Sequence, residues 1–196
     1  MNHLAHIKLA SATPQLLVGN FLADDIKGRL NGQYSPEIEL GIQLHRVIDA
    51  FTDAHPVVLN SHTRLDRKYR RYGGIITDII FDHFLALDWQ QYDDRPLDLF
   101  CQDILQQVLR HSDLMPAATL ERCQRMQAHR SLEQYGKTAF IEHSFNYLSG
   151  RLKRENPLAN AYCQFEEFGD DLKADFIEFF PQLESFVFDW IEQHQC

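Results

Sequence analysis

Hydrophobic positions recur three or four residues apart over most of the sequence, and no segment alternates hydrophobic and polar residues as a strand of a hairpin would. We therefore predict an all-α fold, a compact helical bundle with no internal repeat, in which residues 1–196 form a single domain. Helices are expected over 14–28, 41–54, 59–72, 75–92, 99–112, 117–134, 138–153 and 157–179, with one more closing the chain. Pro14 and Ser35 are start signals, and Gly28 and Gly73 are stop signals.

The segment "IITDIIFDHFLALDW" predicts a buried helix. Its hydrophobic side chains point in every direction around the helix axis, which is typical of a helix with no exposed face. Asp78 and Asp82 lie four residues apart in this segment, and His83 follows directly. Burying an unpaired charge in this helix would cost on the order of several kcal/mol, so these side chains need partners. A divalent cation is one solution, and a metal-free Asp–His pair is the other.

A polar strip runs along the preceding predicted helix, "GIQLHRVIDAFTDAHP". His45, Asp49 and Asp53 recur every fourth residue, so that successive members are offset by roughly 40° around the axis. Leu44 and Ile48 occupy another side, which puts the strip next to the buried face. Spacing alone leaves two interpretations open: a site in a cleft between helices, or ordinary ion pairs on the surface.

Two further segments near the start of the chain carry His or Asp among hydrophobic neighbours. In "GNFLADD", Asp24 follows Asn20 at helical spacing, and in "MNHLAH" His3 and His6 are three residues apart. Motifs of other common enzymes, such as a phosphate-binding glycine loop, a nucleophile elbow or H-E-x-x-H, do not occur. Four short segments within the first 83 residues thus point together toward metal chemistry.

The overall charge limits the possible partners. The chain of 196 residues has a formal net charge of −9, which argues against nucleic acid as a partner. No hydrophobic run is long enough for a membrane span and the start does not resemble a signal peptide, so we expect a cytoplasmic protein. Its 4 cysteines are far apart, which indicates neither a disulfide framework nor a thiolate zinc site. One segment, "RLDRKYRR", is strongly basic: Arg64, Arg67, Lys68, Arg70 and Arg71.

Taken together, "MNHLAH", "GNFLAD", "LHRVIDAFTD" and "DIIFDHFLALDW" resemble, in this order, the acyl carrier protein phosphodiesterases. These are all-helical relatives of the HD-type metal phosphohydrolases with the motifs in permuted order. The resemblance implies hydrolysis of the phosphodiester between 4′-phosphopantetheine and the serine of holo-acyl carrier protein, a step connected with fatty acid biosynthesis. It also implies a divalent metal, manganese by preference, with magnesium or another divalent cation as the alternative.

The same resemblance suggests which residues form the site. Metal ligands would be Asp24, His45, Asp82 and His83. Asp24 would also act in catalysis, where His6, Asp49, Asp53 and Asp78 would serve as further ligands, as a proton-transfer group or as orienting residues. The family usually has an aromatic residue where this chain has His3, so His3 is left out of the expected site.

Acyl carrier proteins are acidic, so an enzyme of net charge −9 needs a local positive surface to bind one. The basic segment Arg64 to Arg71 is the expected contact, and Arg151, with Lys153 and Arg154 beside it, is a second candidate for the carrier or the phosphate. Two other functions are compatible with the sequence. One is a phosphohydrolase acting on a nucleotide or another small phosphoester, and the other is a non-catalytic helical binding module. The oligomeric state is not predicted.

Overall fold

The computed structural model describes residues 2–194, which contain nine α-helices, five short 3-10 helices and no strand. The predicted all-α fold is therefore confirmed. The α-helices are α1 (His3–Leu9), α2 (Pro14–Leu22), α3 (Pro36–Ala54), α4 (Pro56–Arg64), α5 (Gly73–Leu87), α6 (Leu97–Leu109), α7 (Ala117–Ala128), α8 (Thr138–Arg151) and α9 (Tyr162–His194). The 3-10 turns are η1 (Arg70–Tyr72), η2 (Trp89–Gln91), η3 (Ser112–Leu114), η4 (Glu133–Gly136) and η5 (Leu158–Asn160).

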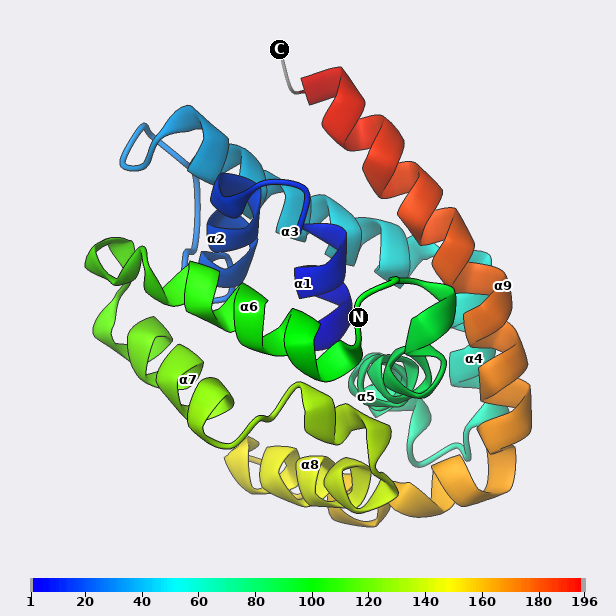
Figure 1. The fold of residues 1–196 in the computed structure, drawn as a ribbon. Helices are drawn as coiled ribbons and strands as arrows, with labels where there is room; N and C mark the ends of the chain where they lie inside the picture. The colour runs from blue at the N-terminus through cyan, green and yellow to red at the C-terminus, as the bar shows by residue number, and fades with distance from the viewer. Residues whose placement is uncertain (1, 195–196) are drawn as a thin grey trace.

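Helix α5 lies in the middle of the bundle, as its all-round hydrophobic pattern predicts. In Figure 1 it is seen nearly end-on, with α9 passing along one side of the molecule and α6, α7 and α8 below and beside it. Helices α1, α4, α8 and α9 all contact α5. Ile76, Ile79, Ile80 and Phe81 are fully buried against these neighbours. The core is therefore built around one helix, and each surrounding helix buries one face against it.

Helix boundaries differ from expectation around the two ends of α4. The helix begins at Pro56, where a proline's missing N–H is unneeded, and the His55 ring nitrogen Nδ1 accepts the N–H of Val57. It ends at Arg64, so most of the basic segment lies in a turn and in η1. Gly73, predicted to end a helix, instead begins α5, and the ring of His62 packs where a side chain at this position would lie.

Helix α9 joins two segments that the sequence predicted as separate helices. It runs unbroken from Tyr162 to His194 with Pro181 inside it. The proline removes one backbone hydrogen bond. Phe179, Phe180 and Leu183 around it are fully buried, and burial of each such side chain contributes about 1.5–3 kcal/mol. Tertiary packing therefore keeps the helix continuous.

Helices α2 and α3 approach closely because glycines meet at their crossing. A methyl group on Gly19 would overlap the backbone of α3 at Ile38, and one on Gly41 would overlap the backbone of α2 at Leu16. Asn20 follows Gly19 directly, and His45 lies one turn after Gly41. The glycine contact thus brings the polar residues at the end of α2 against the polar strip of α3.

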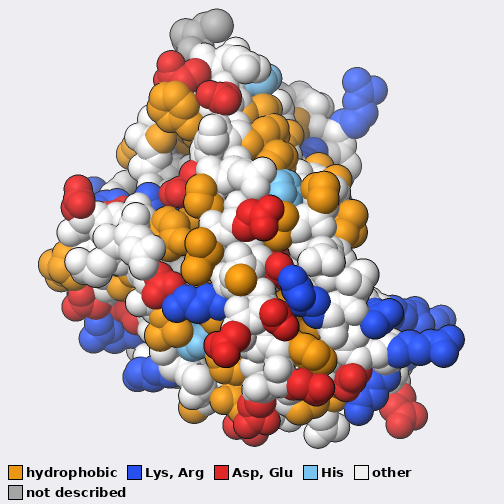
Figure 2. All heavy atoms as spheres, turned by 90° about the vertical axis from the view of Figure 1, so that its right-hand side faces the viewer, with side chains coloured by type: hydrophobic (Ala, Val, Ile, Leu, Met, Phe, Trp, Pro, Cys, Tyr) orange, Lys and Arg blue, Asp and Glu red, His pale blue; other side chains and the backbone are white. Residues whose placement is uncertain are grey.

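Figure 2 shows the face that includes much of α9, where acidic, basic and hydrophobic side chains are interspersed and basic ones gather toward one lower edge. Ile177 and Phe188 are the exposed large hydrophobic side chains of α9. Within residues 2–194, every helix is too short or too polar to cross a lipid bilayer.

Candidate metal and phosphoester site

Three side chains from α1 and α3 form a compact cluster. The His6 Nε2 atom lies 3.1 Å from Asp49 Oδ1, and the His45 Nε2 atom lies 3.3 Å from Asp49 Oδ2. The two imidazole rings stack with their centroids 4.1 Å apart. One possible ligand atom from each of the three residues lies within 4.8 Å of the others. Two imidazoles and a carboxylate in this arrangement could hold a divalent metal ion.

Asn20, near the end of α2, and Asp24, in the turn that follows it, extend the cluster on the side of His45. Asp24 Oδ1 is 3.6 Å from His45 Nε2, and Asn20 Oδ1 is 3.4 Å from His45 Nδ1. When Nδ1 donates its hydrogen to Asn20, the lone pair of Nε2 faces two carboxylates. Such a contact is unfavourable unless a proton or a cation lies between the groups. The donor set therefore fits a bound cation, and Asn20 fixes the ring orientation that presents Nε2 to it.

The pKa values of the cluster suit metal binding at neutral pH. Burial lowers the pKa of His6 to about 4, although its hydrogen bond with Asp49 acts in the opposite direction. Burial by itself would raise the pKa of Asp49, but its interactions with the imidazoles of His45 and His6 outweigh that effect and hold it well below the usual range. Near pH 7, His6 is therefore neutral and Asp49 is ionised, as a metal ligand requires.

Arg122 of α7 connects the cluster to the far side of the bundle. One of its nitrogens is 3.4 Å from Asp24 Oδ2 and another is 3.1 Å from Asp25 Oδ2. Arg122 also donates to the carbonyl oxygen of Phe21 at 2.9 Å, and Thr119 donates to Asp25 at 2.6 Å. Arg122 was not predicted from the sequence, because about a hundred residues separate it from α2 and nothing in its local pattern marks it.

His3, which the sequence analysis set aside, lies beside Asp24. Its Nδ1 atom is 3.9 Å from Asp24 Oδ2, and 36% of its side chain is exposed. Burial lowers its pKa, and the negative charge of Asp24 partly offsets that effect. The signal was present in the i, i+3 spacing of His3 and His6, which places both on one side of α1.

Asp82 and His83, expected to bind metal, lie elsewhere with other partners. The carboxylate of Asp82 is fully buried and accepts the backbone N–H groups of Leu4 at 2.7 Å and of Asn2 and Ala5 at 3.3 Å. It therefore caps the first turn of α1. His83 Nδ1 donates to the carbonyl oxygen of Tyr135 at 2.6 Å. These contacts give Asp82 and His83 Nδ1 partners that neither interpretation of the sequence considered, while His83 Nε2 is buried without a hydrogen-bond partner in the described part of the chain.

The remaining expected residues also lie apart from the cluster. Asp53, the penultimate residue of α3, is exposed. Asp78 is half-buried on α5. Burial lowers the pKa of His62, an effect that the negative charge of Asp78 partly offsets, and burial raises the pKa of Asp82, to which Asp78 adds a smaller effect. Among the described residues, the four predicted ones that the structure brings together are thus His6, Asp24, His45 and Asp49.

The basic segment is only partly available to a partner. Arg64 makes a two-bond ion pair with Asp175 of α9, at 2.8 and 3.0 Å. This pair also includes Ser61, which donates to Asp175 at 2.8 Å. The other four basic side chains are exposed: Arg67, Lys68, Arg70 and Arg71.

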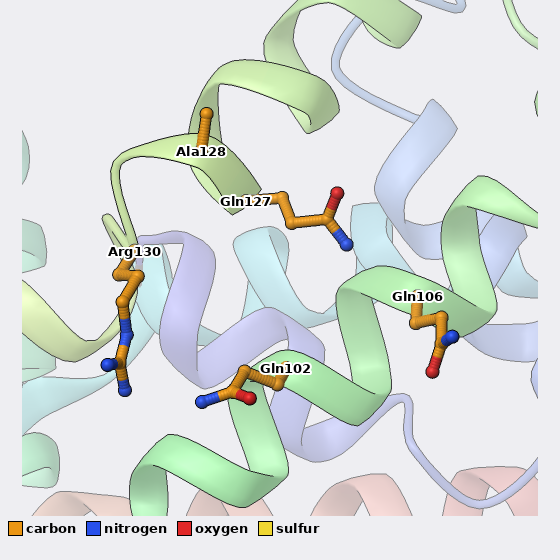
Figure 3. A pocket seen from close by; sticks show the side chains of 5 residues that line it. All are labelled: Gln102, Gln106, Gln127, Ala128 and Arg130. Carbon is orange, nitrogen blue, oxygen red and sulfur yellow. The ribbon is translucent and has the colours of Figure 1, made fainter.

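A hollow of about 530 Å³ between α6 and α7 is unrelated to the cluster. Figure 3 shows that Gln102 and Gln106 of α6, Gln127 and Ala128 of α7, and Arg130 frame it. Amide groups dominate this lining, and no acid or imidazole contributes to it. It therefore offers no group for metal binding or proton transfer.

Comparisons with known proteins identify relatives along almost the whole chain. The sequence profile of the family described as "Acyl carrier protein phosphodiesterase" matches residues 1–183. A protein of that name from Yersinia enterocolitica is 35% identical over 190 residues, which cover 94% of this chain and 96% of the relative. One from Serratia proteamaculans is 34% identical over 184 residues, covering 93% of this chain and 95% of the relative. No solved structure gives a significant match.

Proposed function

The chain belongs to the acyl carrier protein phosphodiesterase family, and from this premise we propose that it hydrolyses the phosphodiester between 4′-phosphopantetheine and the serine of holo-acyl carrier protein. The products are apo-acyl carrier protein and 4′-phosphopantetheine. The observation that supports this proposal at the level of individual residues is the cluster of His6, His45 and Asp49 beside Asp24.

A divalent metal, manganese by preference, is part of this proposal. His6, His45 and Asp49 would hold it, and Asp24 lies close enough to His45 to contribute. A cation bound there supplies Lewis-acid chemistry: it makes a water more acidic and offsets negative charge on a phosphodiester oxygen. Imidazole nitrogens together with carboxylate oxygens are compatible with manganese.

The protein's own side chains supply the other requirements of the reaction. Asn20 fixes the orientation of His45 through the bond to Nδ1. The guanidinium of Arg122, at the edge of the cluster, offsets part of the negative charge of the phosphodiester. The serine oxygen that leaves needs a proton, and we assign its donation to the protonated form of His3, which the negative charge of Asp24 beside it favours against the effect of burial.

The four exposed cations Arg67, Lys68, Arg70 and Arg71 form the proposed contact for the acidic carrier. Ion pairs at such a surface mainly accelerate association and weaken with salt. Arg64 does not belong to this contact, because its guanidinium is held by Asp175.

The test measures the mass of holo-acyl carrier protein after incubation with the purified protein and Mn²⁺. We expect the loss of the phosphopantetheine mass, no loss in EDTA, and recovery when Mn²⁺ is restored. In parallel, a panel of nucleotides and small phosphoesters is assayed under the same conditions. Elemental analysis of the same preparation measures the metal bound per chain.

The alternatives make different predictions. Turnover of a small phosphoester without conversion of the carrier would replace the proposed substrate. Absence of conversion with every divalent cation, together with no stoichiometric metal, would favour a non-catalytic module and overturn the proposal.

A further inference from the structure

A second hollow, of about 400 Å³, opens between α7 and α8 and reaches the N-terminal helix. Three of the side chains that line it are arginines and three are histidines, and none is acidic: Arg122, Arg125, Arg151, His3, His129 and His143. On a protein of net charge −9, such a lining is a pronounced local exception.

One end of this pocket adjoins the metal cluster. His3 and Arg122 belong to its lining, and both face Asp24, at 3.9 and 3.4 Å. Asp24 in turn lies 3.6 Å from His45. A ligand in the pocket can therefore present one end to the cluster while the rest of it extends along α7 and α8.

The lining also contains hydrophobic and aromatic side chains. Phe140, Tyr147 and Leu148 of α8 and Met126 of α7 provide hydrophobic and aromatic surface. Near the end of α8, Arg151 donates to the hydroxyl of Tyr147 at 3.4 Å. The pocket thus suits an elongated, flexible ligand that has a negatively charged end and an uncharged body of amide and methylene groups.

We propose that this α7–α8 pocket binds the 4′-phosphopantetheine arm, with the phosphate between Arg122 and the cluster and the pantetheine chain running past Tyr147 toward Arg151. The inference rests on the proposed function, because it assumes that the substrate carries this arm. It assigns to Arg125, His143, Tyr147 and Arg151 a role in binding the arm, separate from the chemistry at the cluster. Their contacts determine which phosphodiesters bind well.

Direct binding tests the pocket independently of turnover. Titration calorimetry measures the affinity of the Mn²⁺-loaded protein for 4′-phosphopantetheine and, separately, for inorganic phosphate. The variants are Tyr147→Ala and Arg125→Ala, both at exposed positions on α8 and α7 where the fold does not depend on the side chain. Arg110→Ala, at the end of α6 outside the lining, is the matched control for loss of one charge.

We expect Tyr147→Ala and Arg125→Ala each to weaken binding of 4′-phosphopantetheine by about three- to tenfold, the range for one lost contact. Their affinity for inorganic phosphate should match that of the unmodified protein, and Arg110→Ala should bind both ligands normally. Equal affinity of all variants for 4′-phosphopantetheine would overturn the inference, as would a parallel loss for phosphate. A failure of the proposed function would give a different result: the unmodified protein would bind 4′-phosphopantetheine but would not convert holo-acyl carrier protein.

Discussion

Replacing Asp82 by asparagine separates its observed contacts from the metal-binding role that the sequence suggested. In the structure this carboxylate caps α1 by accepting the N–H groups of Leu4, Ala5 and Asn2. Leu4 and Ala5 are fully buried, and a buried N–H left without an acceptor costs about 1–3 kcal/mol. Asp82→Ala would leave both N–H groups without an acceptor. The loss of unfolding free energy would be roughly 2–6 kcal/mol, a large part of a typical stability of about 5–15 kcal/mol.

Asp82→Asn is the better probe, because its remaining carbonyl oxygen can still accept the 2.7 Å bond from Leu4. We expect a loss of about 1–3 kcal/mol from the contacts of the second oxygen. Urea unfolding measures this as a lower midpoint with an unchanged slope. Metal analysis of the folded variant should give the same metal per chain as the unmodified protein.

The effect should also depend on pH. Burial raises the pKa of Asp82 from an ordinary value of 3.8 to about 7, although the N–H donors of Leu4 and Ala5 act to lower it. The folded state therefore holds this proton more tightly than the unfolded state does. The resulting stabilisation is complete below about pH 4 and is lost as the pH rises through 7. Because that rise in pKa corresponds to roughly 4 kcal/mol, the stability difference between the two proteins should shrink over that range and reverse near pH 7, so the urea comparison is made at about pH 5.

A folded Asp82→Asn protein with undiminished stability and no bound metal would refute this reasoning. It would show that the carboxylate serves the metal and that the cap contributes nothing. Asp49→Asn is the comparison, since it changes the same functional group within the cluster.

Four further predictions follow from individual contacts. Asp49→Asn should abolish stoichiometric metal binding and reduce conversion of holo-acyl carrier protein at least a hundredfold, or about 3 kcal/mol, as measured by elemental analysis and the mass assay; retained metal would contradict it. In the metal-free protein, burial keeps the pKa of His6 near 4. The stabilisation that neutral His6 contributes is therefore present above about pH 6.5 and falls by roughly 3 kcal/mol toward pH 4. Urea midpoints measured over this pH range should show that loss in the unmodified protein and not in His6→Gln. His3→Gln should lower kcat while metal content stays constant, and an unchanged kcat would exclude it as the proton donor. Arg64→Ala should destabilise the protein by about 3–5 kcal/mol, because it leaves Asp175 buried without its partner, yet leave the salt dependence of KM for the carrier unchanged.

The sequence alone was sufficient for the class of fold and for the position of the central helix. Helical spacing predicted an all-α protein, and the all-round hydrophobic pattern of 75–87 predicted burial. Both depend on local properties, since periodicity reports directly which faces of a helix exclude water. Boundaries were less predictable: residues 157–179 and the end of the chain were expected to form two helices, but the phenylalanines around Pro181 pack into the core and keep α9 intact.

The composition of the cluster depended on tertiary structure. His45 and Asp49 were recognisable together because they share one helix, and the family pattern added His6 and Asp24. Whether Asp82 points to the cluster or to the start of α1 depends on how α1 sits against α5, a relation between elements about eighty residues apart. No local sequence pattern encodes how two such distant segments pack.

Arg122 is a second residue whose contacts could not be predicted from its local sequence. It reaches Asp24 and Asp25 only because α7 packs near the end of α2, and its own segment gives no sign of that contact. The sequence thus determined which residue types were available and which faces were buried, since both are properties of single helices. The packing of the helices determined which of those residues meet, because such contacts depend on the whole core.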